Sequence, residues 1–265
     1  MKLITLLLSV CCFLLPLSAY AEDARLAEVF NRANANGTIV IYDTASDKYY
    51  IHNDKRANER FYPASTFKIF NSLIALSEGV VKNADEIFYK YNSESVYLDS
   101  WKSDASLRSA IKLSQVPAYK ELARRIGLAK MQHNLHKLHY GDDTCGTKVD
   151  SFWLKGPLTI SAAEQVQLLT ALSQKALPFS QSAQAQVIDI TTLNKAPGYT
   201  LHGKTGWATD NIKTPVGWFV GWAETPRGKY VFALNMDLAD AKNLPQRESI
   251  ALECLQSLKL LPGRV

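Results

Sequence analysis

Hydrophobic and polar residues follow a strand-like pattern near both ends of the chain and a helix-like pattern in the middle. Residues 38–42 form an apolar run, followed by a turn rich in Asp, Thr and Ser and by a second extended run at 48–52. This order predicts a β-hairpin. Further extended runs lie at 199–208, 216–225 and 230–238, and the turn TPRGK separates the last two.

Helical spacing of apolar residues covers residues 26–30, most of 83–180 and the amphipathic segment 246–261. A long apolar helix is also expected at 63–81, with a stop at Gly79. The pattern predicts an α/β (α+β) fold: an antiparallel sheet flanked by terminal helices, with an all-helical subdomain inserted. We expect residues 22–82 and 181–265 to form the mixed part, residues 83–180 the helical part, and a cleft between them to hold a site.

The N-terminal 21 residues have the features of a secretory signal peptide. Lys2 precedes an apolar stretch from Leu3 to Leu17, and Ala19-Tyr20-Ala21 fits a small-x-small cleavage site. No later segment reaches about 18 consecutive apolar residues, so no stable membrane insertion is expected after cleavage. We therefore predict a single exported, periplasmic domain of residues 22–265.

Composition narrows the function classes only a little. Without Lys2 the exported chain has 29 basic and 25 acidic residues, a net charge of +4, and the charges are interspersed. The absence of a basic block or stripe argues against nucleic-acid binding. Cys145 and Cys254 remain in the exported chain, and they could form either a disulfide or two buried thiols.

The segment YPASTFKIF places Ser65 and Lys68 three residues apart, on one face of the expected helix. A helix cap beside a surface lysine is one interpretation of this pattern. However, the helix is apolar nearly all round, which predicts that it is buried, and a buried lysine needs a partner or a function. The alternative is a serine nucleophile with a lysine beside it.

Two further short motifs are weak when each is taken alone. Lys204-Thr205-Gly206 lies in an extended run and could be an edge strand with a tight bend. Ser114-Gln115-Val116 precedes a helix and could be an ordinary cap. Together with Ser65-x-x-Lys68, and in this order, they match the S-x-x-K, S-x-x and K-T-G set of serine enzymes that recognise penicillin.

The sequence resembles the class D, oxacillinase-type serine β-lactamases from about Asn36 to Leu260. YPASTFKI, FWLKGPLTISAAEQVQLL, GKTGWA and GWFVGW are all similar to this family. Val116 fits class D, whereas class A enzymes and many penicillin-binding proteins have Asn at that position. The resemblance implies a β-lactamase/transpeptidase-like fold and hydrolysis of penicillin-type antibiotics, which confers resistance.

The resemblance also implies that Ser65 forms the acyl-enzyme and that Lys68 is an N-carboxylated general base. No cofactor is then needed besides carbon dioxide or bicarbonate. Burial lowers a lysine pKa, and the free amine can add carbon dioxide. Val116 and Leu154 would keep the pocket dry, and the Trp153 indole would hold the carbamate, although Trp153 could instead be core filler.

Further roles follow from the same resemblance. Ser114 would pass a proton to the β-lactam nitrogen, and the backbone N–H groups of Ser65 and Trp207 would form the oxyanion hole. Lys204, Thr205 and Gly206 would line the substrate site. The carboxylate of the substrate would also be bound by Arg247, for which a surface arginine at a helix start is the alternative.

The substrate range, a possible metal site and two rival functions are considered next. Tyr140-Gly141-Asp142 stands where the family usually shows Y-G-N, so its carboxylate could alter substrate choice or belong to a structural turn. His133, His136 and His139 could suggest zinc, but their spacing spreads them over about 120° of a helix, and no metal is expected. A β-lactam-sensing domain and a penicillin-binding D,D-peptidase are the rival functions, and the chain is expected to be a monomer or homodimer.

Overall fold

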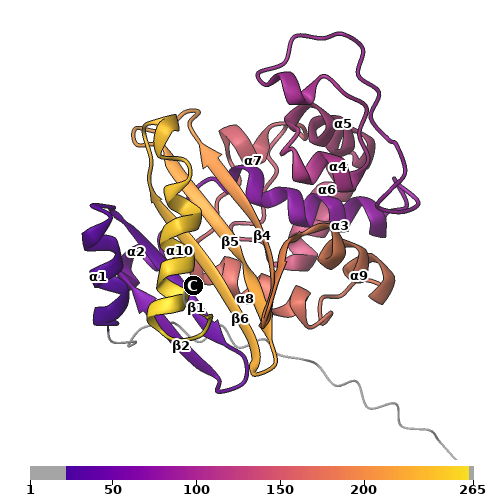
Figure 1. The fold of residues 1–265 in the computed structure, drawn as a ribbon. Helices are drawn as coiled ribbons and strands as arrows, with labels where there is room; N and C mark the ends of the chain where they lie inside the picture. Colours follow the sequence, from indigo (N-terminus) through magenta and orange to yellow (C-terminus); the bar gives the residue numbers. More distant parts are fainter. Residues whose placement is uncertain (1–21, 263–265) are drawn as a thin grey trace, which may run out of the picture.

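A six-stranded antiparallel sheet forms the centre of the computed structural model, which describes residues 22–262 (Figure 1). The strand order is β2-β1-β6-β5-β4-β3. The strands are β1 (Gly37–Asp43), β2 (Lys48–His52), β3 (Thr192–Ala196), β4 (Tyr199–Ala208), β5 (Val216–Thr225) and β6 (Gly228–Asp237). The N-terminal hairpin thus pairs with the C-terminal strands, with Val40 opposite Ala233.

Helices cover both faces of this sheet. The two terminal helices, α1 (Ala24–Arg32) and α10 (Gln246–Ser257), pack on one face and contact each other (Figure 1). Their apolar stripes bury Leu26, Val29 and Ile250 against the strands, as expected for amphipathic surface helices. Helix α8 (Ala162–Ser173) covers the opposite face. It begins with a capping box formed by Ser161 and Glu164.

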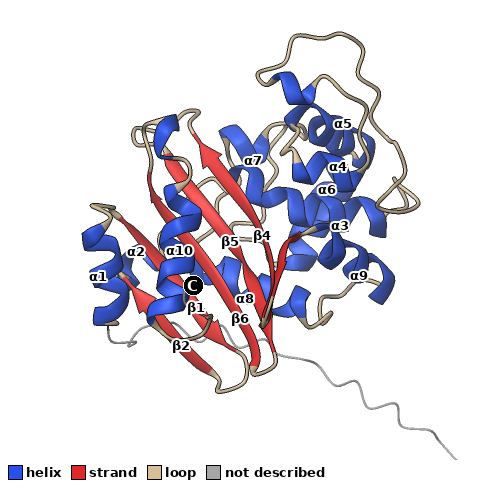
Figure 2. Cartoon of the chain, viewed as in Figure 1, coloured by secondary structure: helices blue, strands red, loops and turns tan. Residues whose placement is uncertain are grey.

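The remaining helices gather beyond the β3–β4 side of the sheet (Figure 2). They are the short turn η1 (Ala64–Phe67), α3 (Lys68–Ser77), η2 (Asp99–Trp101), α4 (Leu107–Lys112), α5 (Val116–Ile126), α6 (Leu128–Leu138), α7 (Phe152–Lys155) and α9 (Gln181–Ile190). Two other short elements, α2 (Asp54–Ala57) and η3 (Ala241–Asn243), lie beside the sheet. The predicted fold class, a sheet with terminal helices and a helical insert, is confirmed.

Some elements differ from the pattern expected from the sequence. Helix α8 falls in the segment expected to be part of the helical subdomain, yet it packs on strands β1, β5 and β6. The sequence pattern also missed α9 and β3. Strand β3 is a mostly exposed edge strand of sequence TLNKA, so it carries no alternation of apolar and polar residues.

The two cysteines lie on opposite sides of the sheet. Cys145 belongs to the core shared with the helical part, and Cys254 to the core beneath the terminal helices. Both are buried free thiols, so the disulfide alternative is wrong. Among residues 22–262, no helix is long and apolar enough to cross a membrane. The predicted signal peptide, residues 1–21, lies outside the described residues.

Candidate active site

Ser65 lies in the turn η1, directly before helix α3, and Lys68 is the first residue of that helix. The residue before the serine, Ala64, has a left-handed backbone with a φ of 48°, which is strained for a residue with a side chain. Lys68 is completely buried, and its Nζ donates to Ser65 Oγ over 2.7 Å. The surface-lysine alternative is therefore wrong.

The environment of Lys68 disfavours its charged form. Burial lowers the pKa of the ammonium well below its usual value, and the nearby positive charge of Lys204 lowers it further. The aromatic ring of Tyr119 lies 5.3 Å from Lys68 Nζ, and this tyrosine is itself fully buried. No carboxylate forms an ion pair with Lys68 within the described residues, so a neutral amine hydrogen-bonded to Ser65 is favoured.

Strand β4 brings the K-T-G motif against the serine turn. Strand β3 pairs with β4 only from Tyr199 to His202. The next N–H of β4, that of Gly203, points to the same edge of β4 and donates to Thr191 O over 2.9 Å. Because N–H groups alternate in direction along a strand, the N–H groups of Thr205 and Trp207 point to that side, beyond the end of β3.

Gly206 allows this close approach. A Cβ atom at this position would lie 3.1 Å from both Pro63 O and Thr66 Cγ2, which is tighter than ordinary van der Waals contact. A side chain here would push β4 away from the turn that carries Ser65. Glycine thus favours the close packing of two segments that are far apart in the sequence.

Lys204 and Arg247 place positive charge beside this strand. Lys204 Nζ donates to Thr205 O over 2.9 Å, and burial, followed by repulsion from Arg247, lowers the pKa of Lys204 to about 7. Arg247 is 9% exposed, and its Nη1 donates to Gly206 O over 2.8 Å. Burial lowers the pKa of Arg247 to about 10. The surface alternative for Arg247 is wrong, because its guanidinium is bound to the backbone of the K-T-G strand.

Ser114 lies at the turn between α4 and α5 and has a left-handed φ of 53°. It does not cap α5, since the N-cap of that helix is Gln115. Within residues 22–262 the Ser114 hydroxyl makes no hydrogen bond to Ser65 or Lys68. Helices α4 and α5 both contact α3, so the turn lies on the side of the helical part that adjoins Lys68.

Trp153 is buried in an aromatic cluster next to the serine turn. Its ring centroid lies 5.7 Å from that of Phe67, the residue before Lys68, and 5.1 Å from that of Phe152. Its indole Nε1 is buried without a hydrogen-bond partner among the described residues. A buried donor of this kind is costly unless an acceptor is provided, so core filling alone does not account for Trp153. Val116 and Leu154 are both partly buried.

The Tyr140-Gly141-Asp142 segment forms a structural turn. The Asp142 carboxylate accepts from Thr159 N over 3.0 Å and from Thr159 Oγ1 over 2.7 Å. Gly141, with a φ of 58°, lies so close to Thr159 O that no Cβ would fit. The carboxylate thus holds Thr159, and the next residue, Ile160, pairs with Phe61 in an isolated antiparallel β-bridge.

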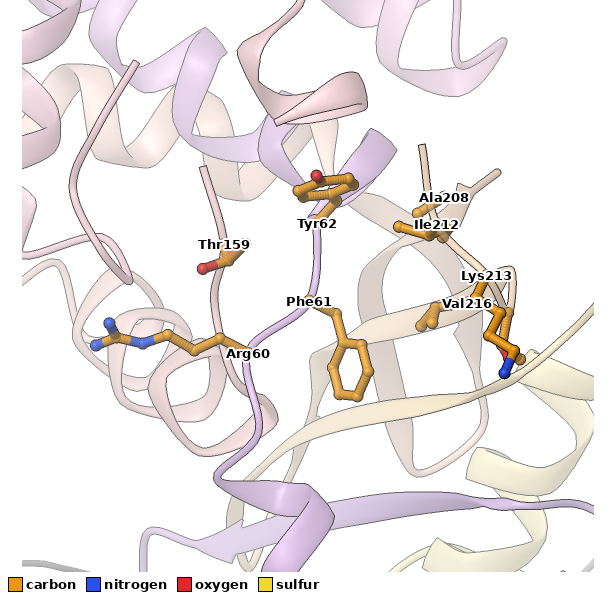
Figure 3. A pocket seen from close by; sticks show the side chains of 9 residues that line it. Arg60, Phe61, Tyr62, Thr159, Ala208, Ile212, Lys213 and Val216 are labelled. Atoms are coloured by element: carbon orange, nitrogen blue, oxygen red, sulfur yellow. The ribbon is translucent and has the colours of Figure 1, made fainter. Parts of the chain in front are cut away.

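A pocket of about 300 Å³ adjoins this turn (Figure 3). Tyr62 precedes the serine turn and Ala208 follows Trp207, so the pocket lies next to the predicted site. Its lining is Arg60, Phe61, Tyr62, Thr159, Ala208, Ile212, Lys213, Thr214 and Val216. The pocket joins residues 60–62 to residues 208–216, which lie about 150 residues apart, so local sequence patterns do not reveal it.

The histidine series does not form a metal site. His136 Nδ1 lies 3.0 Å from Asp143 Oδ2, and His139 ends α6 with a left-handed backbone. In the part of the chain that the structure describes, no group of three or more His, Cys, Asp or Glu residues could hold a metal ion.

A serine hydrogen-bonded to a buried lysine and facing a K-T-G strand, on a sheet with a helical insert, defines a serine enzyme of the penicillin-recognising transpeptidase class. A family model described as the penicillin-binding protein transpeptidase domain matches residues 37–256. The chain is 39% identical to β-lactamase OXA-48 of Klebsiella pneumoniae, over 88% of this chain and 87% of that protein. It is 36% identical to OXA-10 of Pseudomonas aeruginosa, over 91% of each chain.

Solved structures narrow the family further. The crystal structure of FUS-1 (OXA-85), a class D β-lactamase from Fusobacterium nucleatum subsp. polymorphum, is 55% identical and superposes with a TM-score of 0.90. The match covers 91% of this chain and all of that one. The chain belongs to the class D serine β-lactamases.

Proposed function

We propose that the chain hydrolyses penicillin-type β-lactams through an acyl-enzyme on Ser65. The observation that carries this proposal is the 2.7 Å contact between Ser65 Oγ and a fully buried Lys68 whose charged form is disfavoured. The neutral amine can add carbon dioxide with loss of a proton, and the carbamate oxygens can then take the hydroxyl proton as the serine oxygen attacks the β-lactam carbonyl. The sensor domain and the D,D-peptidase are not favoured, since the relatives are β-lactamases.

The remaining steps are assigned to residues around this pair. The N–H groups of Ser65 and Trp207 stabilise the developing oxyanion, and the direction of the Trp207 N–H beyond the end of β3 supports this role. When the ring C–N bond breaks, Ser114 delivers a proton to the nitrogen. The positive charges of Lys204 and Arg247 attract the carboxylate of the substrate, with Thr205 and Gly206 beside them.

Release of the acyl group needs a base that activates water, and we assign it to Lys68 carrying a carbamate. The carbamate, formed from carbon dioxide or bicarbonate, supplies anionic oxygens that can accept a proton from water. The unpartnered indole N–H of Trp153 supports this assignment, because it is a buried donor beside the lysine turn that needs an acceptor. Val116 and Leu154 help to exclude bulk water, which keeps the amine neutral before it reacts.

Steady-state hydrolysis of a chromogenic β-lactam tests the proposed function. Many turnovers per enzyme are expected for the parent chain and none for Ser65→Ala, since only the hydroxyl oxygen forms the ester. A single stoichiometric burst without turnover would overturn the hydrolase in favour of a sensor or a penicillin-binding target. Export to the periplasm is part of the proposal, and N-terminal sequencing of the secreted protein, with cleavage expected after Ala21, tests it.

A further inference from the structure

The turn that carries Ser114 is held from outside by one segment of the chain. Ser114 has a φ of 53°, the left-handed conformation common just after a helix, and backbone hydrogen bonds from Ser114 N to Ile111 O over 3.2 Å and from Gln115 N to Ala110 O over 2.9 Å close the end of α4. Within the described residues its side chain makes no hydrogen bond. The position of the hydroxyl is therefore set by the backbone of the two residues on either side, Leu113 and Gln115.

Both of these neighbours are bound to Trp101. The indole Nε1 of Trp101 donates to Leu113 O over 3.0 Å. In the other direction, Gln115 Nε2 donates to Trp101 O over 2.8 Å and to Ser103 O over 2.9 Å. The turn is thus clamped on its N-terminal side by the Trp101 side chain and on its C-terminal side by the Trp101 backbone.

Two of the three residues that form the clamp, Trp101 and Gln115, are buried. Trp101 is 9% exposed and Gln115 is fully buried, so solvent does not readily replace the hydrogen bonds that Gln115 makes. Leu113, in contrast, is 36% exposed. Loss of the indole N–H would let the Leu113 carbonyl turn toward water without unfolding the chain. The turn at Ser114 would keep its backbone hydrogen bonds to α4 but would lose its bond to the Trp101 side chain.

We infer that Trp101 is a positioning residue, which sets the Ser114 hydroxyl where it can deliver a proton to the β-lactam nitrogen. This inference rests on the proposed role of Ser114. Trp101 acts only through Leu113 and Gln115 and has no part in the bond changes themselves. Its effect should therefore disappear when the Ser114 hydroxyl is absent.

A double-mutant cycle tests this dependence. Trp101→Phe keeps an aromatic ring beside Tyr97 and removes the N–H donor. Since general acid catalysis contributes about 10²- to 10⁴-fold and small misplacements forfeit part of it, we expect kcat/KM to fall roughly 10-fold. Ser114→Ala should cause a larger loss, and the double variant should be no slower than Ser114→Ala alone.

The outcomes separate the inference from the function on which it rests. If the two losses multiply in the double variant, or if Trp101→Phe is as fast as the parent, the positioning role is wrong. If Ser114→Ala itself has no effect on kcat/KM, the proposed role of Ser114 fails, and the inference fails with it for a different reason.

Two controls keep the test independent of folding. Trp222→Phe also removes an indole hydrogen bond, from Nε1 to Glu224 Oε1 over 3.3 Å, but on strand β5, and should leave kcat/KM unchanged. If Trp101→Phe does not fold, benzothienylalanine at position 101 keeps the size and shape of the indole and replaces only the N–H by sulfur. The same non-multiplicative cycle with Ser114→Ala is then expected, and a multiplicative one overturns the inference.

Discussion

Trp153→Phe is the substitution that most directly tests the carbamate on Lys68. The indole N–H of Trp153 is fully buried and without a partner among the described residues. The Trp153 ring packs against Phe67, the residue before Lys68. Phenylalanine keeps an aromatic side chain against Phe67 and Phe152 and removes the donor. If the donor binds a carbamate oxygen, the variant should bind carbon dioxide more weakly.

The size of the effect follows from the charge of the acceptor. A hydrogen bond to a charged group contributes about 1.5–3 kcal/mol, which corresponds to a bicarbonate requirement about 10- to 150-fold higher. If no acceptor ever reaches Trp153, the bicarbonate requirement should not rise and the free energy of unfolding should not fall. Removing an unsatisfied buried donor would then relieve its desolvation penalty, and Trp153→Phe would be neutral or stabilising apart from the lost ring volume.

The assay is a titration of activity with bicarbonate after carbon dioxide has been stripped from the enzyme. Half-maximal turnover of a chromogenic β-lactam gives the apparent affinity, and the ¹³C signal of labelled carbamate gives the same quantity without turnover. Trp222→Phe is the matched control, because it loses an indole hydrogen bond on β5 and should keep the parent titration.

An unchanged bicarbonate requirement in Trp153→Phe would refute the reasoning. A parallel rise in both variants would also refute it, since the effect would then reflect a general loss of stability. The free energy of unfolding, measured in urea, separates these outcomes.

The remaining predictions concern the K-T-G strand and the Asp142 turn. Gly206→Ala should lower the free energy of unfolding by about 1–3 kcal/mol, because its Cβ would press on Pro63 O, and should lower kcat/KM; urea unfolding and kinetics check this, and parent values would contradict the close approach. Since the pKa of Lys204 is about 7 and only its protonated form attracts a carboxylate, kcat/KM should fall as pH rises through 7. Lys204→Arg should move this decline upward, and a pH–rate profile with no such shift would exclude Lys204 as its origin. Asp142→Asn should lower the free energy of unfolding by less than about 1 kcal/mol, because an amide oxygen can still accept from Thr159 N–H. Asp142→Ala should lower it by about 1–3 kcal/mol. Equal losses of stability in thermal denaturation would show that the charge matters instead.

Short-range patterns were sufficient to predict the two-part fold. The β-hairpin, the apolar helix after Pro63 and the three C-terminal strands all have periodicities that a local window detects. Strand β3 escaped because it is a mostly exposed edge strand without alternating apolar residues. Helix α9 escaped although it buries Ala183, Gln184, Val187 and Ile190. Their structure depends on the neighbours against which they pack.

The sequence by itself indicated the candidate residues for the proposed chemistry. Ser65 and Lys68 share a helix face at a spacing of three residues, and Val116 distinguishes the class, because these properties depend only on residue type and order. The tertiary structure alone decided that Lys68 is fully buried beside Lys204, that Arg247 binds Gly206 O, and that Trp101 holds the Ser114 turn. Solvent exclusion and close approach arise from elements distant in the chain, so a lysine pKa is a property of the whole fold rather than of its motif.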